Sequence, residues 1–224
     1  MRIVFISPSF YPSIGGVEEH VLRVSRELTK RGYEVTVITE WKDEFKQRRR
    51  KSDSDAKEFK KVEESSLFVH RKLYQTNIYY FKFGGASILK KFKIWYYLLK
   101  SYNIFLASDV IHCHDVFIWY FPLKLIFPFK KVYTTFHGYE GTFPPEEKSI
   151  WIRKASVKLS SGVICVGDFI KRWYGTSPDY VTYGGVNPVQ SSEYKPRFAE
   201  SRVHSSKRRM RILLVPGPRG FSSL

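Results

Sequence analysis

Two adjacent glycines, Gly15 and Gly16, form the part of the sequence with the clearest chemical meaning. They follow a short apolar run at residues 3–6 and precede an amphipathic segment that begins at Val17. Glycine has no Cβ, so the backbone can approach a ligand closely, and the free N–H groups at a helix start attract an anion. The pattern therefore predicts a site for a phosphate or diphosphate group.

The flanking residues are typical of a strand, a helix and a second strand. From Val17, apolar residues recur at helical spacing, and Gly32 is suited to end the helix in a left-handed conformation. Residues 34–39 alternate as a strand, which makes the whole a βαβ unit of a parallel sheet. The alternative is a dinucleotide site, with Glu40 as the ribose-binding acid, but the G-x-G-x-x-G fingerprint is missing.

Histidines offer a second kind of chemistry at the ends of two predicted strands. His112 and His114 share one face of a strand, and Asp115 follows them. A zinc site needs three or four ligands, and the sequence places no third one beside this pair, so we expect no metal. His137 ends another strand next to Gly138, at the carboxyl edge where open α/β sheets collect ligands. It is either a binding-site residue or a capping or core histidine.

Longer stretches of the sequence resemble one protein family. Residues 10–39, FYPSIGGVEEHVLRVSRELTKRGYEVTVIT, resemble the amino-terminal signature of the family 4 retaining glycosyltransferases, which have the two-domain GT-B fold. Later segments follow in the order that the family shows, namely DVIHCH at 109–114, VYTTFHG at 132–138, GVICV at 162–166 and YVTYGGVN at 180–187. The last segment departs from the family in having Asn187 where Asp is usual.

The resemblance implies transfer of a sugar from a nucleotide-diphosphate donor, with retention at the anomeric carbon and with no metal or other cofactor. It implies that the amides of Gly15 and Gly16 bind the donor diphosphate, and that His137 is the catalytic-site residue that contacts sugar or acceptor hydroxyls. It also implies acceptor contacts by three residues near the first helix: Tyr11, Glu18 and His20. Glu18 and Glu19 have the alternative role of complementing the helix dipole.

The length of 224 residues suits one well-buried domain and is short for two. We expect a Rossmann-like glycosyltransferase domain at 1–190, a basic linker at 191–211, and the start of a second domain or a tail at 212–224. In the resembled family the second domain carries the donor-binding groups, so we expect the chain alone to be inactive. The alternatives are a non-catalytic subunit that binds acceptor and membrane beside a separate donor-binding chain, or an inactive remnant.

The chain is strongly basic, with 38 Lys and Arg against 21 Asp and Glu and a net charge of +17, and therefore attracts anionic surfaces. Lysines and aromatic residues share the segment 88–100, which favours a membrane surface formed by Lys90, Lys91, Lys93 and Trp95. This segment also suggests a lipid-linked or phospholipid acceptor. The alternative is an ordinary helix that packs one side on the sheet through Ile88, Phe92, Trp95 and Leu99. Nucleic acid is excluded as a partner because no reading motif accompanies the basic residues.

Apolar runs that alternate with helical stripes predict a doubly wound parallel α/β sheet, Rossmann-like, the amino-terminal half of a GT-B architecture. Strands are expected near 2–7, 34–39, 67–73, 109–114, 131–136, 162–166 and 180–183, and helices near 17–31, 87–102, 117–126, 147–160 and 168–175. The polar residues 42–61 predict a solvated loop. The sequence has no membrane-spanning segment and no signal peptide, so we expect a cytoplasmic protein, with a peripheral place on the cytoplasmic face of the membrane as the further expectation. Cys113 and Cys165 are expected to be reduced.

Overall fold

The computed structural model of this protein describes residues 1–41, 60–65, 67–84, 89–138 and 144–183. Contacts between Cα atoms divide the chain into two units, Met1–Gly185 and Val186–Leu224, and every described residue belongs to the first. The expected linker at 191–211 and the segment 212–224 therefore lie outside the described residues, as does most of the loop expected at 42–61.

The described part of the chain forms one nine-stranded sheet with the order β3-β4-β5-β2-β1-β6-β7-β8-β9. From β5 to β9 every neighbouring pair is parallel, and β4 pairs antiparallel with both β3 and β5. The strands are β1 (Arg2–Ser7), β2 (Glu34–Glu40), β3 (Lys60–Glu64), β4 (Phe68–Leu73), β5 (Thr76–Phe81), β6 (Val110–His114), β7 (Lys131–Phe136), β8 (Gly162–Val166) and β9 (Tyr180–Thr182).

The antiparallel edge is the part of the sheet that the sequence did not predict. Strands β4 and β5 form a hairpin, and the two residues of its turn, Tyr74 and Gln75, both have positive φ angles of 52° and 75°. This is the backbone of a type I′ turn, which usually carries Asn and Gly. With a tyrosine and a glutamine there, the turn has no local signature, and β5 and β3 were not predicted.

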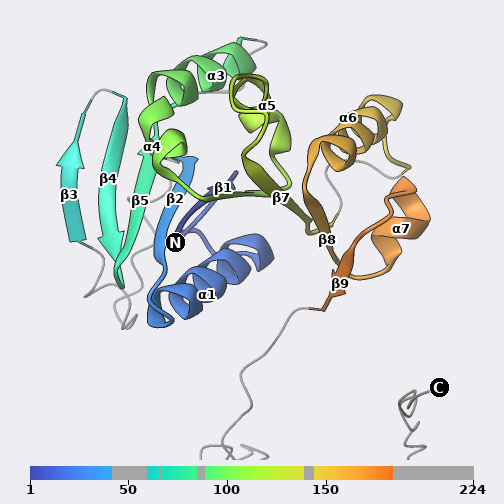
Figure 1. The fold of residues 1–224 in the computed structure, drawn as a ribbon, viewed down its shortest axis with the longest axis horizontal. Helices are drawn as coiled ribbons and strands as arrows, with labels where there is room; N and C mark the ends of the chain where they lie inside the picture. Colours follow the sequence, from blue (N-terminus) through green and yellow to red (C-terminus); the bar gives the residue numbers. More distant parts are fainter. Residues whose placement is uncertain (42–59, 66, 85–88, 139–143, 184–224) are drawn as a thin grey trace, which may run out of the picture. The chain divides into compact units, whose positions relative to one another are not determined.

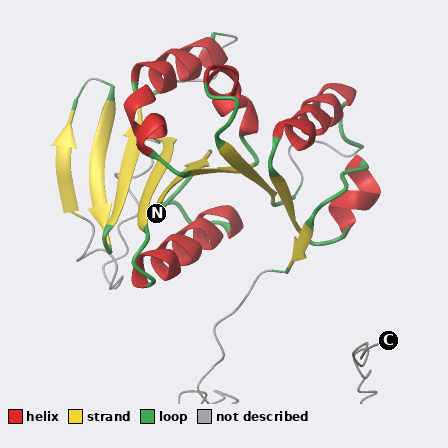
Figure 2. Ribbon diagram, in the orientation of Figure 1, coloured by secondary structure: helices red, strands yellow, loops and turns green. Residues whose placement is uncertain are grey.

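Helices cover both faces of the sheet, which confirms the doubly wound architecture (Figure 1). Helix α1 (Gly16–Lys30) packs on one face, and α3 (Lys90–Lys100), α4 (Tyr102–Ala107) and α5 (Phe117–Ile126) pack on the other. Helices α6 (Glu147–Leu159) and α7 (Phe169–Tyr174) accompany the strands β7 to β9 (Figure 2). The single helix expected at 87–102 is instead two helices, because the described helix ends at Lys100 and α4 begins after Ser101.

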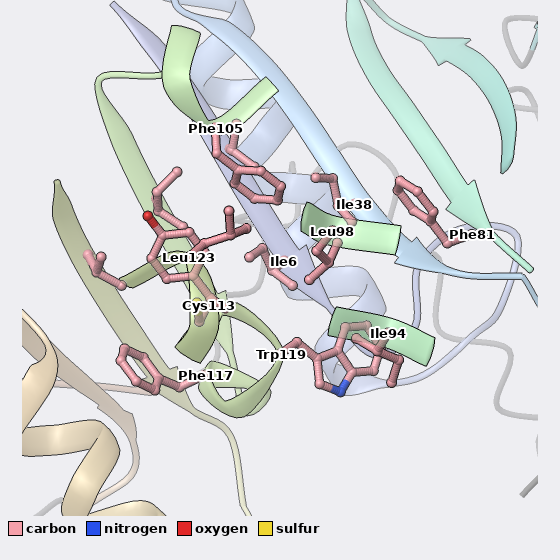
Figure 3. Packing of buried hydrophobic residues seen from close by; sticks show 14 of the residues in the cluster. Ile6, Ile38, Phe81, Ile94, Leu98, Phe105, Cys113, Phe117, Trp119 and Leu123 are labelled. Atoms are coloured by element: carbon pink, nitrogen blue, oxygen red, sulfur yellow. The ribbon is translucent and has the colours of Figure 1, made fainter. Parts of the chain in front are cut away.

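The core consists of separate clusters on the two faces, and β1 contributes to both. Ile3 and Phe5 pack beneath α1, and Val4 and Ile6 pack into the larger cluster under α3 and α5 (Figure 3). All four side chains are buried, as expected for a central parallel strand covered on both faces. Burial on both sides fixes β1, and with it the position of the turn that follows β1.

A proline inside α5 explains how α3 is attached. Pro122 has no N–H, so the carbonyl of Ile118, four residues earlier, has no partner within the helix. The indole Nε1–H of Trp95 in α3 donates to this carbonyl at 2.8 Å. Trp95 thus replaces the missing helix bond, and the side of α3 that carries it is turned toward α5.

Candidate functional site

The glycine turn lies at the carboxyl end of β1, as the sequence predicted. Gly15 is the N-cap of α1 with an extended backbone, φ −177°, and Gly16 is the first helical residue. A Cβ on Gly16 would meet no protein atom within 4 Å, whereas a Cβ on Gly15 would collide with the carboxylate of Glu18. The extended backbone of Gly15 is open to any residue, so what a glycine provides at 15 and 16 is room beside the first helical amides.

The two acidic residues of the first turn behave differently. Glu19 pairs with Arg23 at 2.5 Å on the exposed surface of the helix. Glu18 folds back so that its carboxylate lies against Gly15. A carboxylate at this end of the helix interacts favourably with the positive end of the dipole. The structure therefore supports the dipole role for Glu18, whose acceptor contact stays a prediction.

Tyr11 lies in the loop between β1 and α1, and its position is fixed through its backbone. The Tyr80 hydroxyl on β5 donates to the Tyr11 carbonyl. The Tyr11 side chain packs against the cluster beneath α1 and is partly buried. The structure thus shows an anchoring contact for Tyr11, and contact with an acceptor stays a prediction.

Three imidazoles from three elements meet at the carboxyl edge of the sheet. His114 ends β6, His137 follows β7, and His20 lies in α1 one turn beyond the glycines. The His114 Nδ1 and His137 Nε2 atoms are 3.0 Å apart and form a hydrogen bond. The His20 ring centroid lies 4.8 Å from that of His137 and 5.8 Å from that of His114. The fold therefore brings two predicted site residues, His20 and His137, into contact.

His112 lies on the same face of β6 as His114, as its spacing suggested, but outside the group formed by His114, His20 and His137. Its Nε2 atom lies 2.7 Å from the hydroxyl of Thr135 on β7, and its ring stacks on His114 with centroids 4.4 Å apart. His112 thus supports His114 from within the core. The sequence paired His112 with His114 as the nearest approach to a metal site and found no third ligand, but the structure groups His114 with His20 and His137.

Two residues that sequence reasoning did not single out for this role hold the end of β7 in place. Asp115 adopts a left-handed backbone, φ 59°, and its Oδ1 accepts the backbone N–H of His137 at 2.9 Å. Arg153 of α6 donates from Nη2 to the carbonyl of Gly138 at 3.1 Å, and its guanidinium lies over the rings of Phe136 and Tyr174. Asp115 follows the paired histidines and could have been noticed, whereas Arg153 has no signal in the sequence.

Burial keeps the imidazoles of this edge neutral at neutral pH. Loss of solvent lowers the pKa of His137 to about 4 and the pKa of His112 to about 3, with nearby imidazoles as the lesser cause. The same effects bring the pKa of His114 well below its ordinary value, and burial lowers the pKa of His20. Neutral imidazoles exchange hydrogen bonds with hydroxyl groups or bind metals, and they do not provide positive charge for a phosphate.

The residues predicted to form a membrane surface do not all face outward. Lys91 and Lys93 are exposed, but Lys90 forms a 2.6 Å ion pair with Glu40 at the end of β2, and Trp95 bonds to α5. The packing predicted for the alternative is wrong in part. Trp95 and Leu99 do pack against the core, but Phe92 is 62% exposed and the fully buried residues of α3 are Ile94 and Leu98. Ile88 lies outside the described residues. Among the described helices, none has the length and apolar character needed to cross a membrane.

The chain is similar to known proteins in sequence profile and in structure. Residues 14–189 match the sequence profile of a family described as Glycosyltransferase Family 4. No curated protein matches the chain. Among solved structures, the chain is similar to the catalytic domain of starch synthase IV from Arabidopsis thaliana bound to ADP and acarbose, with 15% identity, TM-score 0.49, and coverage of 76% of this chain and 45% of that one.

A second similar structure is a glycosyltransferase from Rickettsia africae ESF-5, with 14% identity, TM-score 0.48, and coverage of 81% of this chain and 42% of that one. The chain thus spans less than half the length of either structure. The profile match extends over most of the chain and includes the glycine turn, the ends of β6 and β7, and His20. The chain belongs to glycosyltransferase family 4.

Proposed function

We propose that this chain forms the acceptor-side wall of a sugar-transfer site that uses a nucleotide-diphosphate donor. Family membership supports glycosyl transfer in general. One observation carries the finer proposal, namely the 4.8 Å between the ring centroids of His20 and His137, because it joins the helix opened by Gly15 and Gly16 to the end of β7. An anion site and a hydroxyl-binding imidazole thus share one edge of the sheet.

The chemistry of transfer assigns different tasks to these groups. The bond between the anomeric carbon and a diphosphate oxygen breaks, and the diphosphate departs with the electron pair. Backbone amides at Gly15 and Gly16, with the helix dipole behind them, would stabilise this developing charge. An acceptor hydroxyl oxygen forms the new bond to carbon and gives up its proton.

His137 is suited to position a hydroxyl group and is a weak base. Because burial lowers its pKa to about 4, the departing diphosphate is a better acceptor for the hydroxyl proton than this imidazole is. A neutral ring can still donate or accept one hydrogen bond from a sugar or acceptor hydroxyl. Retention at the anomeric carbon and the nucleotide part of the donor rest on the family resemblance.

The anion site is tested with inorganic diphosphate as the probe. We expect diphosphate to shift the amide NMR signals of Gly15 and Gly16 in the unaltered chain. The variant Gly16→Ala is a sharp test, because the added methyl meets no protein atom within 4 Å yet stands beside the helix start. We expect it to weaken diphosphate binding at least about 10-fold while the helix gains up to about 1 kcal/mol of stability.

A Gly16→Ala variant that binds diphosphate as tightly as the unaltered chain would place the anion elsewhere. The same holds if millimolar diphosphate shifts no signal near α1. Thermal unfolding is the control, since a loss of folding would explain weak binding without any role for Gly16. His137→Ala should leave diphosphate binding unchanged, because its neutral ring adds no charge to the anion site.

We further propose that the acceptor is presented at an anionic lipid surface that contacts α3 and its neighbours. The exposed part of α3 combines the apolar Phe92 and Tyr96 with Lys91 and Lys93. More large apolar side chains are exposed nearby on α4, α5 and the residues that flank them: Leu89, Tyr102, Leu106, Leu125, Ile126 and Phe129. Apolar side chains interspersed with lysines suit the boundary between lipid headgroups and acyl chains.

Vesicles test this second proposal. We expect binding to phosphatidylcholine vesicles only when they contain phosphatidylglycerol, and at least about a 10-fold loss on the double change Lys91→Glu and Lys93→Glu. Lys30→Glu on α1, on the opposite face of the sheet, is the matched control and should leave binding unchanged. Equal binding to both kinds of vesicle, or equal loss in the control, would contradict the proposal.

A further inference from the structure

Three histidines at the edge of the sheet form a group with the composition of a metal site. The possible ligand atoms of His20, His114 and His137 all lie within 4.8 Å of one another. Within the part of the chain that the structure describes, this is the one group of three or more histidine, cysteine or acidic side chains that is close enough to share an ion. The three rings come from separate elements, so the fold itself assembles the group.

The spacing of the nitrogens is near that of a tetrahedral zinc site. Zinc binds imidazole nitrogen at about 2.0–2.1 Å, which places two nitrogen ligands of one ion roughly 3.4 Å apart. His114 Nδ1 and His137 Nε2 are 3.0 Å apart and need to separate only slightly. His20 is partly buried on α1, and its ring must shift toward this pair to complete the group, because the ligand atoms of the three residues lie as much as 4.8 Å apart.

The hydrogen bond within the cluster indicates which nitrogen of His114 could hold an ion. His114 Nδ1 is the atom that faces His137 Nε2. His114 also has a buried Nε2 atom that makes no hydrogen bond with any described residue. A neutral imidazole has one nitrogen with a lone pair and one N–H group, so with Nδ1 as the ligand atom the proton of His114 lies on this Nε2 atom.

The ligands are also held from behind. The backbone N–H of His137 is bonded to Asp115, and His114 stacks on His112, which is itself bonded to Thr135. Such outer contacts orient the ligands of a metal and reduce the entropy lost on binding. Imidazole nitrogens select zinc, cobalt, nickel and copper, whereas magnesium and calcium require oxygen ligands.

We propose that His20, His114 and His137 bind one zinc-class divalent ion, with the fourth coordination position open on the partly exposed side of the cluster. The site is assigned from this chain's own residues and does not depend on the sugar-transfer proposal. It has one consequence for that proposal: an ion that takes a lone pair of His137 competes with a sugar hydroxyl for the same nitrogen.

Isothermal titration with zinc chloride tests the site in the unaltered chain, and cobalt chloride gives an optical reading of the geometry. We expect one zinc per chain and, with cobalt, the strong visible absorption of a tetrahedral ion. His20→Ala and His137→Ala should each lower zinc affinity by more than about 100-fold. Loss of a direct ligand should exceed the roughly 10- to 100-fold loss that follows a change in a residue behind a ligand. Magnesium chloride should produce no binding heat.

The other histidines supply matched controls. His70→Ala removes an imidazole on β4 that is bonded to Asn77, and His204→Ala removes one outside the described residues. Both should bind zinc as the unaltered chain does, and thermal unfolding should show that all four variants are folded. Absence of zinc binding, loss in either control, or retention of full affinity in His20→Ala would overturn the proposal, whatever the result with diphosphate.

Discussion

The glycine turn and the histidine cluster lie at the same edge of the sheet but are built in opposite ways. The turn offers backbone groups with open space beside Gly16, and one flexible side chain, Glu18, lies against it. The cluster consists of buried or partly buried rings, fixed from behind by Asp115 and by Arg153. The difference indicates two tasks: the turn can admit a group that comes and goes, while the cluster holds its partners in a set geometry.

The largest effect should come from removing Arg153, and it would sharpen this contrast. Arg153 is 4% exposed, and its guanidinium lies 3.9 Å from the Tyr174 ring centroid and donates to the Gly138 carbonyl. Arg153→Ala removes a desolvated cation–π contact and a charged hydrogen bond, so we expect a loss of about 3 kcal/mol in unfolding free energy. Denaturant unfolding measures it, with Lys154→Ala on the exposed side of α6 as the control.

An Arg153→Ala variant as stable as the Lys154→Ala control would break the contrast. The end of β7 would then be held without its buried cation, and the cluster would be no more rigid than the glycine turn. The variant Arg153→Leu keeps apolar volume at this position but removes the charge. Comparing its stability with that of Arg153→Ala therefore separates the loss of packing volume from the loss of charge.

A smaller effect is expected at Asp115, where two substitutions separate backbone from side chain. Asp115→Ala loses the acceptor for the His137 N–H and places alanine in a left-handed backbone, so we expect a loss of about 2 kcal/mol. Asp115→Asn keeps an oxygen acceptor and tolerates that backbone, so its loss should stay below about 1 kcal/mol. Urea unfolding of the two variants side by side provides the measurement. Equal losses in both variants would show that the carboxylate charge, and not its geometry, holds His137.

The smallest effect concerns Glu18 and tests whether the turn is open to exchange. Its carboxylate lies where an anion would approach the first amides, so removing the charge with Glu18→Gln should raise the affinity for inorganic diphosphate about 2- to 5-fold. Glu19→Gln is the matched control, because Glu19 pairs with Arg23 on the helix surface. An unchanged or lower affinity in Glu18→Gln would mean that the carboxylate does not compete for the site.

The sequence predicted the parallel strands β1, β2 and β6 to β9 because their signals are local, but it missed β5, which pairs parallel with β2. The apolar run of β1, the helical stripe of α1 and Gly32, which has φ 82°, each carry their own signature within a few residues. The hairpin of β4 and β5 was missed because its two turn residues have no such signature. The inward side of α3 was predicted only in part, because Trp95 and Leu99 lie on it but Ile94 and Leu98 are its fully buried residues. The helical stripe could not show that α3 packs against α5 as well as on the sheet.

In the candidate site, too, local features were predicted and contacts between distant segments were not. The glycine turn was predicted because its residues are consecutive. The family resemblance placed His20 and His137 in one site, but the sequence did not add His114 to them. His114 and His137 follow His20 by 94 and 117 positions, and the three meet only through the strand order β1-β6-β7. Nothing near Arg153 in the sequence indicates that its guanidinium lies between two rings of other elements.

The indole bond from Trp95 to the carbonyl that Pro122 leaves free has a mechanical consequence. It couples α3 to α5 at the point where Pro122 leaves α5 without one of its own backbone bonds, so we expect the two helices to move together. The bond between Trp95 and α5 thereby helps to set the direction of the exposed aromatic and lysine side chains of α3. A partner that binds this outer surface therefore acts on α3 and α5 together.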